Sequence, residues 1–90
     1  MNRFPLGCML ATPGAKAALE RSGQSALEFF ARHIRCDWGE VDQEDWRLND
    51  EALERGERLL SAYRNRCGEK LWIITEADRS ATTVLLPSEY

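Results

Sequence analysis

The stretch LWIITEADRSATTVLLPSEY, residues 71–90, decides the fold because it holds two apolar runs separated by a short polar segment. Runs rich in branched and aromatic residues, with turn-forming residues between them, are typical of β-strands in a hairpin. We therefore predict strands at residues 70–75 and 81–86, joined by a turn at 76–80. Pro87 ends the second strand, where a missing amide donor does least harm.

Further strands are predicted on the N-terminal side of this hairpin. RLLSAY, residues 58–63, has the same composition and is separated from the hairpin by turn-forming residues 65–69. Connections this short make the three strands an antiparallel meander. Residues 6–11 form one more short strand near the start of the chain.

The first two of three predicted helices follow that N-terminal strand. Thr12 can cap the first helix, and Pro13 suits its first position because the missing N–H would be unbonded there. Gly23 ends this helix. Ser25 and Glu28 have the spacing of a capping box for the second helix. The apolar positions of the second helix, which fall on one face, are Leu27, Phe30 and Ile34.

The third predicted helix is the most charged part of the chain. It starts at Asp42, with acidic residues in its first turn, where the helix dipole favours them, and it ends at Gly56. We expect a bend at Asn49–Asp50, because both side chains compete for backbone hydrogen bonds. The expected buried stripe consists of Trp46, Leu48, Ala52 and Leu53.

Together these elements predict a single compact α+β domain over residues 1–90. The predicted order is an N-terminal strand, three helices and a three-stranded antiparallel meander. Helices that follow one strand and precede a meander are expected to pack on one face of the sheet.

Composition narrows the class of protein. The chain has 90 residues, of which 43% are hydrophobic and 30% charged, as expected for a folded domain. A formal charge of -3 argues against strong binding to nucleic acid, which needs clustered Lys and Arg.

No run approaches the roughly 18 apolar residues of a membrane span. Three widely spaced cysteines without a C-x-x-C pair favour the reducing cytoplasm over a disulfide scaffold.

His33 and Cys36 are the one pair of residues with the types needed for an activated thiolate. Their spacing puts them on neighbouring positions of a helix. A catalytic site needs a third, orienting group, so packing at the helix end is the favoured interpretation. With one His and no paired Cys, we predict no transition-metal site and no cofactor.

The polar segment of the hairpin has two interpretations. Asp78 and Ser80 can bond to the backbone and fix a plain turn, which is the favoured interpretation. The alternative is an acid–base or phosphate-binding group formed by Glu76, Asp78 and Arg79 at the rim of the sheet.

Two tryptophans bracket the acidic helix and are candidates for an interface. Trp38 and Trp46 are expected to pack in the small core, but an exposed Trp beside mixed charge is also a good anchor for a partner. In the second case the contact residues would be Trp38, Trp46, Asp45 and Asn49.

The chain resembles a family of small uncharacterised bacterial proteins carried on plasmids and integrated mobile elements, called plasmid-related proteins. The resemblance covers nearly the whole chain and is carried by ATPGAKAALERSGQSALEFFARH, DWGEVDQEDWRLNDEAL and RLLSAYRNRCGEKLWIITEADRSATTVLLPSEY. It implies a bacterial cytoplasmic protein belonging to accessory or anti-defence gene content.

A second resemblance is one of topology alone. A strand, helices and then an antiparallel meander is similar to RelE/ParE toxins, whose RelE-type members cleave messenger RNA on the ribosome. This resemblance implies that Arg64, Arg66 and Arg79 grip phosphate, with Glu76 or Asp78 as the base. The last strands of such toxins carry a basic surplus, whereas here acidic residues are interleaved with the basic ones.

We therefore expect a small cytoplasmic interaction or regulatory module that binds a protein partner. An RNA-directed toxin and an anti-defence protein are the alternatives. The exposed edge of a small sheet also allows two copies to pair as a homodimer.

Overall fold

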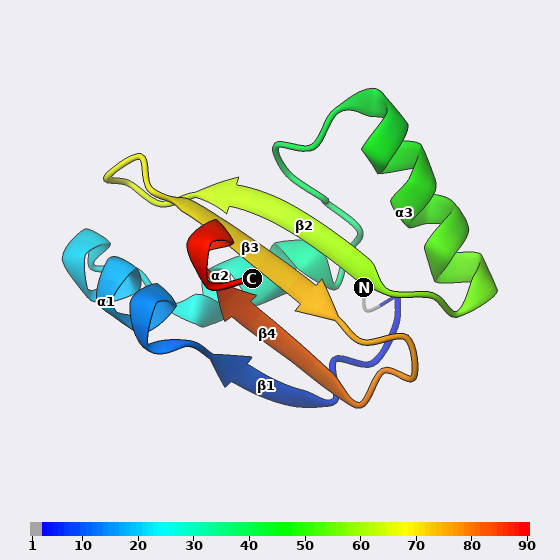
Figure 1. The fold of residues 1–90 in the computed structure, drawn as a ribbon, viewed down its shortest axis with the longest axis horizontal. Coiled ribbons are helices and arrows are strands. Elements are labelled where there is room, and N and C mark those ends of the chain that lie inside the picture. Colours follow the sequence, from blue (N-terminus) through cyan, green and yellow to red (C-terminus); the bar gives the residue numbers. More distant parts are fainter. Residues whose placement is uncertain (1–2) are drawn as a thin grey trace.

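The computed structural model describes residues 3–90, which fold as a four-stranded sheet with three α-helices (Figure 1). The strands are β1 (Cys8–Ala11), β2 (Leu59–Arg64), β3 (Lys70–Thr75) and β4 (Ala81–Leu85). The helices are α1 (Pro13–Ser22), α2 (Ala26–His33) and α3 (Gln43–Arg55), and a short 3-10 turn, η1 (Pro87–Glu89), follows β4. The predicted order of one strand, three helices and three strands is confirmed.

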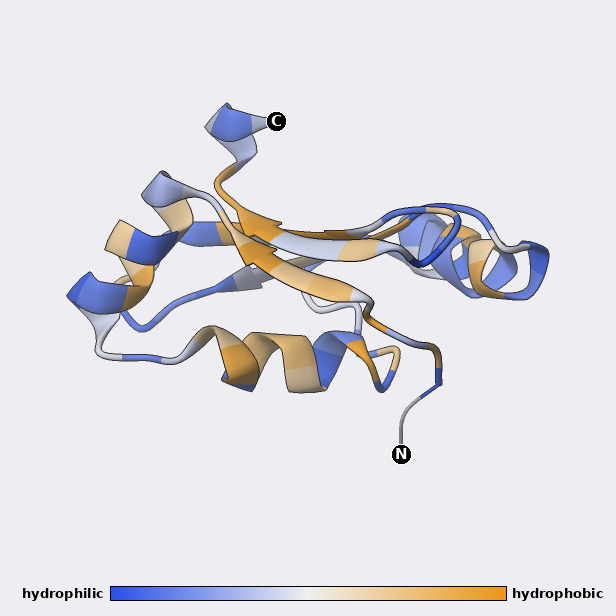
Figure 2. Cartoon of the chain, turned by 90° about the horizontal axis from the view of Figure 1, so that it is seen from below, coloured by the Kyte–Doolittle hydropathy of each residue, from blue (hydrophilic) through white to orange (hydrophobic). Residues whose placement is uncertain are grey.

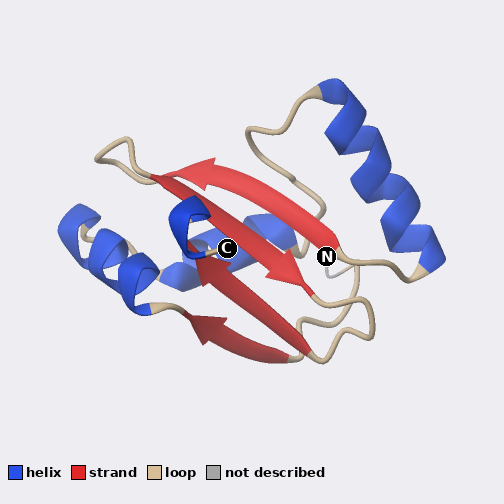
Figure 3. Cartoon of the chain, viewed as in Figure 1, coloured by secondary structure: helices blue, strands red, loops and turns tan. Residues whose placement is uncertain are grey.

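The sheet has the strand order β1-β4-β3-β2. The hairpins β2–β3 and β3–β4 are antiparallel, as short connections require, whereas β1 pairs with β4 in parallel. The sheet is therefore mixed rather than purely antiparallel (Figure 3). β1 is separated from the meander by all three helices, so connection length does not fix its neighbour or its direction.

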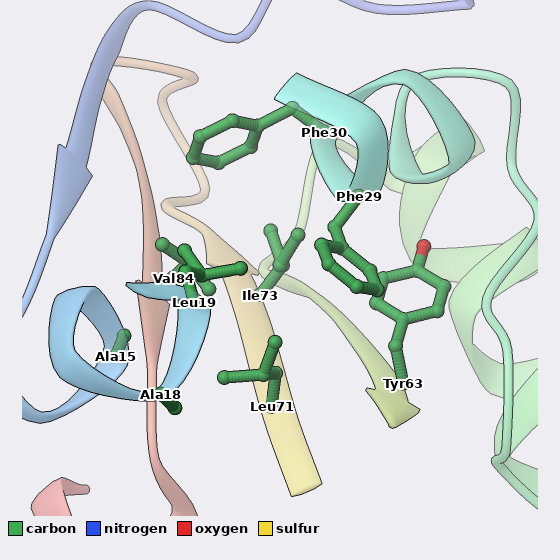
Figure 4. Packing of buried hydrophobic residues seen from close by; sticks show 9 residues of the cluster. All are labelled: Ala15, Ala18, Leu19, Phe29, Phe30, Tyr63, Leu71, Ile73 and Val84. Atoms are coloured by element: carbon green, nitrogen blue, oxygen red, sulfur yellow. The ribbon is translucent and has the colours of Figure 1, made fainter. Parts of the chain in front are cut away.

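The inner face of the sheet holds the main core. Because side chains alternate along a strand, β3 sends Leu71 and Ile73 to this face, and β4 sends Val84. They pack against the apolar faces of α1 and α2 (Figure 4). The contributing residues of the two helices are Ala15, Ala18, Leu19, Phe29 and Phe30.

The outer face of the sheet is covered differently. Figure 2 shows α2 on one side of the sheet and the short η1 segment on the other, with α1 at one end of the sheet. Tyr90, just after η1, packs edge-on against Trp72 of β3, with the ring centroids 5.7 Å apart. Leu60 on β2 also lies on this face, opposite Ile74. Much of the outer face is left without a helix.

The position of α3 corrects the expectation that all helices pack on one face. This helix lies beside the outer edge of β2 (Figure 1). It also runs unbroken through Asn49–Asp50. Two of the residues expected in its buried stripe, Trp46 and Leu48, are 37% and 48% exposed. In α2, Leu27 is exposed as well, because the buried positions are Phe29, Phe30 and His33.

Candidate functional site

A groove runs between α3 and the outer face of the sheet. It has a volume of about 490 Å³. We call it the α3 groove; its wall on the helix side is formed by Asp45, Leu48 and Ala52, and its wall on the sheet side by Arg58, Leu60 and Trp72. It combines apolar side chains with a few charged groups, which is the usual composition of a binding site.

The start of α3 is fixed by its own sequence. The Asp42 side chain accepts a hydrogen bond from the backbone N–H of Asp45 at 2.7 Å and caps the helix. Glu44 and Asp45 stand in the first turn, where the helix dipole favours negative charge. Gly56 ends the helix in the left-handed conformation, with φ 70°.

Asn49 attaches α3 to the sheet. Its side-chain amide donates to the carbonyl of Leu60 at 2.8 Å, and its carbonyl oxygen accepts from the N–H of Leu60 at 3.0 Å. The amide thus bonds to β2 in the same way as a neighbouring strand would. Asn49 is only 8% exposed, so it positions the groove and offers little surface to a partner.

The two tryptophans have different environments. Trp38 is 0% exposed, stacks on Phe4 and donates from its indole nitrogen to Asp50 at 3.0 Å. It therefore cannot serve as an accessible anchor, which corrects its place among the contact residues. Trp46 is 37% exposed and lines two other hollows beside α3, not the α3 groove itself.

Negative charge concentrates on α3 and its ends, and two of these carboxylates, Asp45 and Glu57, line the α3 groove together with Arg58. Residues 42–57 carry seven carboxylates and two arginines, a formal charge of -5 in a chain whose total is -3. Arg47 is held by Glu44 and Glu51 on the solvent side of the helix. The carboxylates are Asp42, Glu44, Asp45, Asp50, Glu51, Glu54 and Glu57.

The polar segment between β3 and β4 is tied into the fold. The Arg79 guanidinium donates to the carbonyls of Glu57, Glu76 and Ala77, and it lies 5.7 Å from the centre of the Phe4 ring. Asp78 accepts from the N–H of Ser80 at 3.0 Å, and hydrogen bonds from Ser80 lower the pKa of this carboxyl group. These contacts fix the conformation of the turn.

The three arginines expected to bind phosphate do not lie together. Arg79 lies in the β3–β4 turn, whereas Arg64 and Arg66 lie at the β2–β3 hairpin, at the opposite end of the sheet (Figure 1). Arg64 is paired with Glu40 at 2.9 Å. No joint site of Arg64, Arg66 and Arg79 with Glu76 or Asp78 is formed.

His33 lies at the centre of a buried polar chain that sequence reasoning did not anticipate. It is 0% exposed, and its ring nitrogens bond to the hydroxyls of Ser61 at 2.5 Å and Thr75 at 2.8 Å. Thr75 bonds in turn to Thr82, whose hydroxyl donates to the carbonyl of Leu6 at 2.7 Å. The chain joins α2 to β2, β3 and β4.

This environment changes the chemistry of the imidazole. Burial and, as a smaller cause, the positive charge of Arg79 together lower the pKa of His33 to about 3. Both ring nitrogens are occupied by hydroxyls, so neither is available to activate Cys36. Burial also raises the pKa of the Cys36 thiol, which opposes formation of a thiolate. The pair is not arranged as a nucleophile and its base.

Within residues 3–90, no three His, Cys, Asp or Glu side chains come together in a way that could hold a metal ion. None of the described helices is both long enough and apolar enough to cross a membrane.

Sequence reasoning missed Leu48, Arg58 and Trp72 as surface residues. The signal was present in β3, where Leu71 and Ile73 alternate with Trp72 and Ile74, so that both faces of one strand are apolar. Such a strand has either two covered faces or one apolar face open to a partner.

The fold and the groove define a small α+β protein with a half-covered mixed sheet. No family model matches the chain, and neither the curated proteins nor the solved structures that were searched contain a match.

Proposed function

We propose that the protein is an interaction or regulatory module that binds a partner protein in the α3 groove. The observation that carries the proposal is the groove itself, where half-exposed Leu48 faces the sheet residues Leu60 and Trp72. An apolar surface bordered by polar groups is the usual form of a protein interface.

The charge around the groove indicates the chemistry of the partner. Residues 42–57 have a formal charge of -5, while the rest of the chain carries +2. A partner segment with apolar side chains for the groove and Lys or Arg at its margins would match both properties. We propose a basic, amphipathic protein segment as the ligand.

We also propose that the module belongs to mobile-element gene content, as a regulatory or anti-defence protein of bacterial cytoplasm. The resemblance to plasmid-related proteins supports the origin, and three free cysteines support a reducing compartment. The test is the gene neighbourhood, followed by a phage-infection assay with and without the protein.

The binding test compares two leucines that are both exposed on helices. Leu48→Glu puts a carboxylate into the acidic groove, whereas Leu27→Glu, on the 62% exposed Leu27 of α2, changes a surface away from it. Tagged wild-type protein should recover a protein partner from nuclease-treated lysate, and Leu48→Glu should recover at least about tenfold less. Leu27→Glu should match the wild type.

Binding should also weaken as salt is raised, because the attraction between an acidic groove and a basic segment is screened. Equal recovery by both variants would contradict the role of the groove. Recovery that disappears on nuclease treatment would contradict the module and favour the toxin-like alternative.

A further inference from the structure

The rest of the fold covers one edge of the sheet, at β2, and leaves the other edge, at β1, uncovered. At β2, the N–H and C=O of Leu60 are both bonded to Asn49. Next along the same edge, Ala62 donates to the carbonyl of Trp38 at 3.0 Å and accepts from the N–H of Glu40 at 2.6 Å. The outward groups at both positions of β2 are therefore already paired.

Gly39 makes this covering of β2 feasible. It has φ 77°, and a Cβ at this position would lie 2.1 Å from the carbonyl oxygen of Ala62. Only glycine allows the loop between α2 and α3 to approach the strand so closely. The loop that contains Gly39 therefore covers the edge of β2.

The edge formed by β1 has no such covering. Cys8 donates to Ser80 and Thr12 donates to Val84, so these residues direct their peptide groups toward β4. By alternation, the N–H and C=O of Met9 and Ala11 point away from the sheet. Within residues 3–90 these outward groups have no hydrogen-bond partner, and Figure 1 shows no element beyond β1.

The side chains of β1 do not protect this edge either. Met9 is 51% exposed and Leu10 is 47% exposed. Residues 8–11, CMLA, contain no charge and no proline, two of the devices by which natural edge strands avoid pairing with other chains, so only the short length of β1, four residues, limits such pairing.

We propose that β1 pairs with β1 of a second copy of this chain, antiparallel and with Leu10 opposite Leu10. In this register Met9 of each copy lies opposite Ala11 of the other, and each such pair exchanges two hydrogen bonds. All outward groups of both residues are then satisfied. The two Leu10 side chains meet on the outer face of a continuous sheet.

A second copy fits this edge better than an unrelated strand for two reasons. The pattern of outward groups is complementary to itself about a two-fold axis, and the closed β2 edge stops association at two copies instead of a fibre. Pairing through four residues should bury less than the roughly 1,200 Å² of a typical stable complex. We therefore expect a concentration-dependent dimer.

Disulfide trapping tests the register. In a Cys8→Ser/Cys67→Ser background, Leu10→Cys should give a covalent dimer on mild oxidation, because opposite residues in antiparallel strands have Cβ atoms about 4.5–5.5 Å apart. In the Leu10-centred register the two native Cys8 residues are four positions apart along the strands, or roughly 13 Å. Native Cys8, in a Cys67→Ser background, should therefore not be trapped.

The mass in solution tests the pairing itself. Sedimentation should show a monomer–dimer equilibrium for the wild type, and Met9→Pro should weaken it at least tenfold by removing an outward N–H. Met9→Ala, which keeps that N–H, is the matched control and should weaken dimerisation less. Because the Met9 N–H makes no bond to β4, Met9→Pro should keep the wild-type circular dichroism spectrum.

Three outcomes would overturn the proposal. A monomer at every concentration, without trapping of Leu10→Cys, rejects the dimer. Trapping through Cys8 in place of Leu10→Cys rejects the register. A monomer that loses a different protein partner on Met9→Pro assigns the edge to another chain.

Discussion

His33 is the residue whose chemistry the fold changes most. It is fully buried, and its ring is packed edge-on against Phe4 and Trp38, with centroid distances of 5.3 and 5.5 Å. Neutral imidazole can serve as both a donor and an acceptor, which matches its two hydroxyl partners. A proton added at low pH would have to be accommodated without a neighbouring carboxylate.

Because His33 is buried as a neutral ring, we predict that acid lowers the stability of the fold. The pKa of His33 is about 3 in the folded protein and about 6.5 when unfolded, so the unfolded chain binds the extra proton first. Stability contributed by the neutral ring is complete above about pH 6.5 and is lost as the pH falls toward 3. Between pH 7.5 and 5 the free energy of unfolding should fall by about 2 kcal/mol.

Urea unfolding at both pH values measures this change. His33→Gln is the matched control, because an amide retains hydrogen bonding but does not titrate; most of the pH dependence in this window should disappear in it. If the free energy of unfolding of His33→Gln changes with pH as much as that of the wild type, the pH dependence comes from carboxyl groups. The pKa values of Asp37, Glu69 and Glu89 are lowered by their hydrogen bonds. The stability that these carboxylates contribute to the fold is therefore lost only at lower pH.

At the scale of elements, α3 depends on few contacts. Its buried residues are Asn49 and Ala52, and partly buried Leu53 packs with Ala52 against the small cluster that contains Trp38 and Leu59. The hydrogen bonds between α3 and β2 depend on the Asn49 amide. The Trp38–Asp50 hydrogen bond supplies a second attachment, from the loop that precedes the helix.

Asn49→Ala should loosen α3. It leaves the N–H and C=O of Leu60 without their partners at a position that is largely buried, which costs about 1–3 kcal/mol. Glu54→Ala, on the exposed side of the same helix, is the control and should stay within about 0.5 kcal/mol of the wild type. Denaturant unfolding gives the difference, and hydrogen exchange should rise first in α3. Equal stability of both variants would show that other contacts hold the helix.

At the scale of the whole molecule, sequence patterns predicted the elements better than their arrangement. The hairpins follow from local turns at residues 65–69 and 76–80, so the meander was predictable. The parallel pairing of β1 with β4 is non-local, and no connection length encodes it. Asn49 illustrates the same limit, because a residue expected to weaken the helix instead bonds to a strand 11 positions away.

The candidate site was predictable to a similar extent. The concentration of charge near Trp46 and Asp45 is visible in the sequence, and Asp45 lines the α3 groove, whereas Trp46 lies outside it. The sheet side of the groove was not predictable, because alternation alone does not say which face of β3 remains uncovered. Trp38 and Trp46 have similar sequence surroundings, yet only one of them is buried.

This difference between the tryptophans gives a test of the whole fold. A domain of this length has a modest core and a total stability of about 5–10 kcal/mol, so one large core residue matters greatly. Trp38→Ala removes a fully buried ring that packs with Phe4, Ala52 and Leu59, and it should cost about 3–5 kcal/mol. Trp46→Ala should cost less, about 1–2 kcal/mol, because 37% of this residue is already exposed. Thermal unfolding of both variants measures this, and similar losses would mean that Trp46 belongs to the core and is not available to a partner.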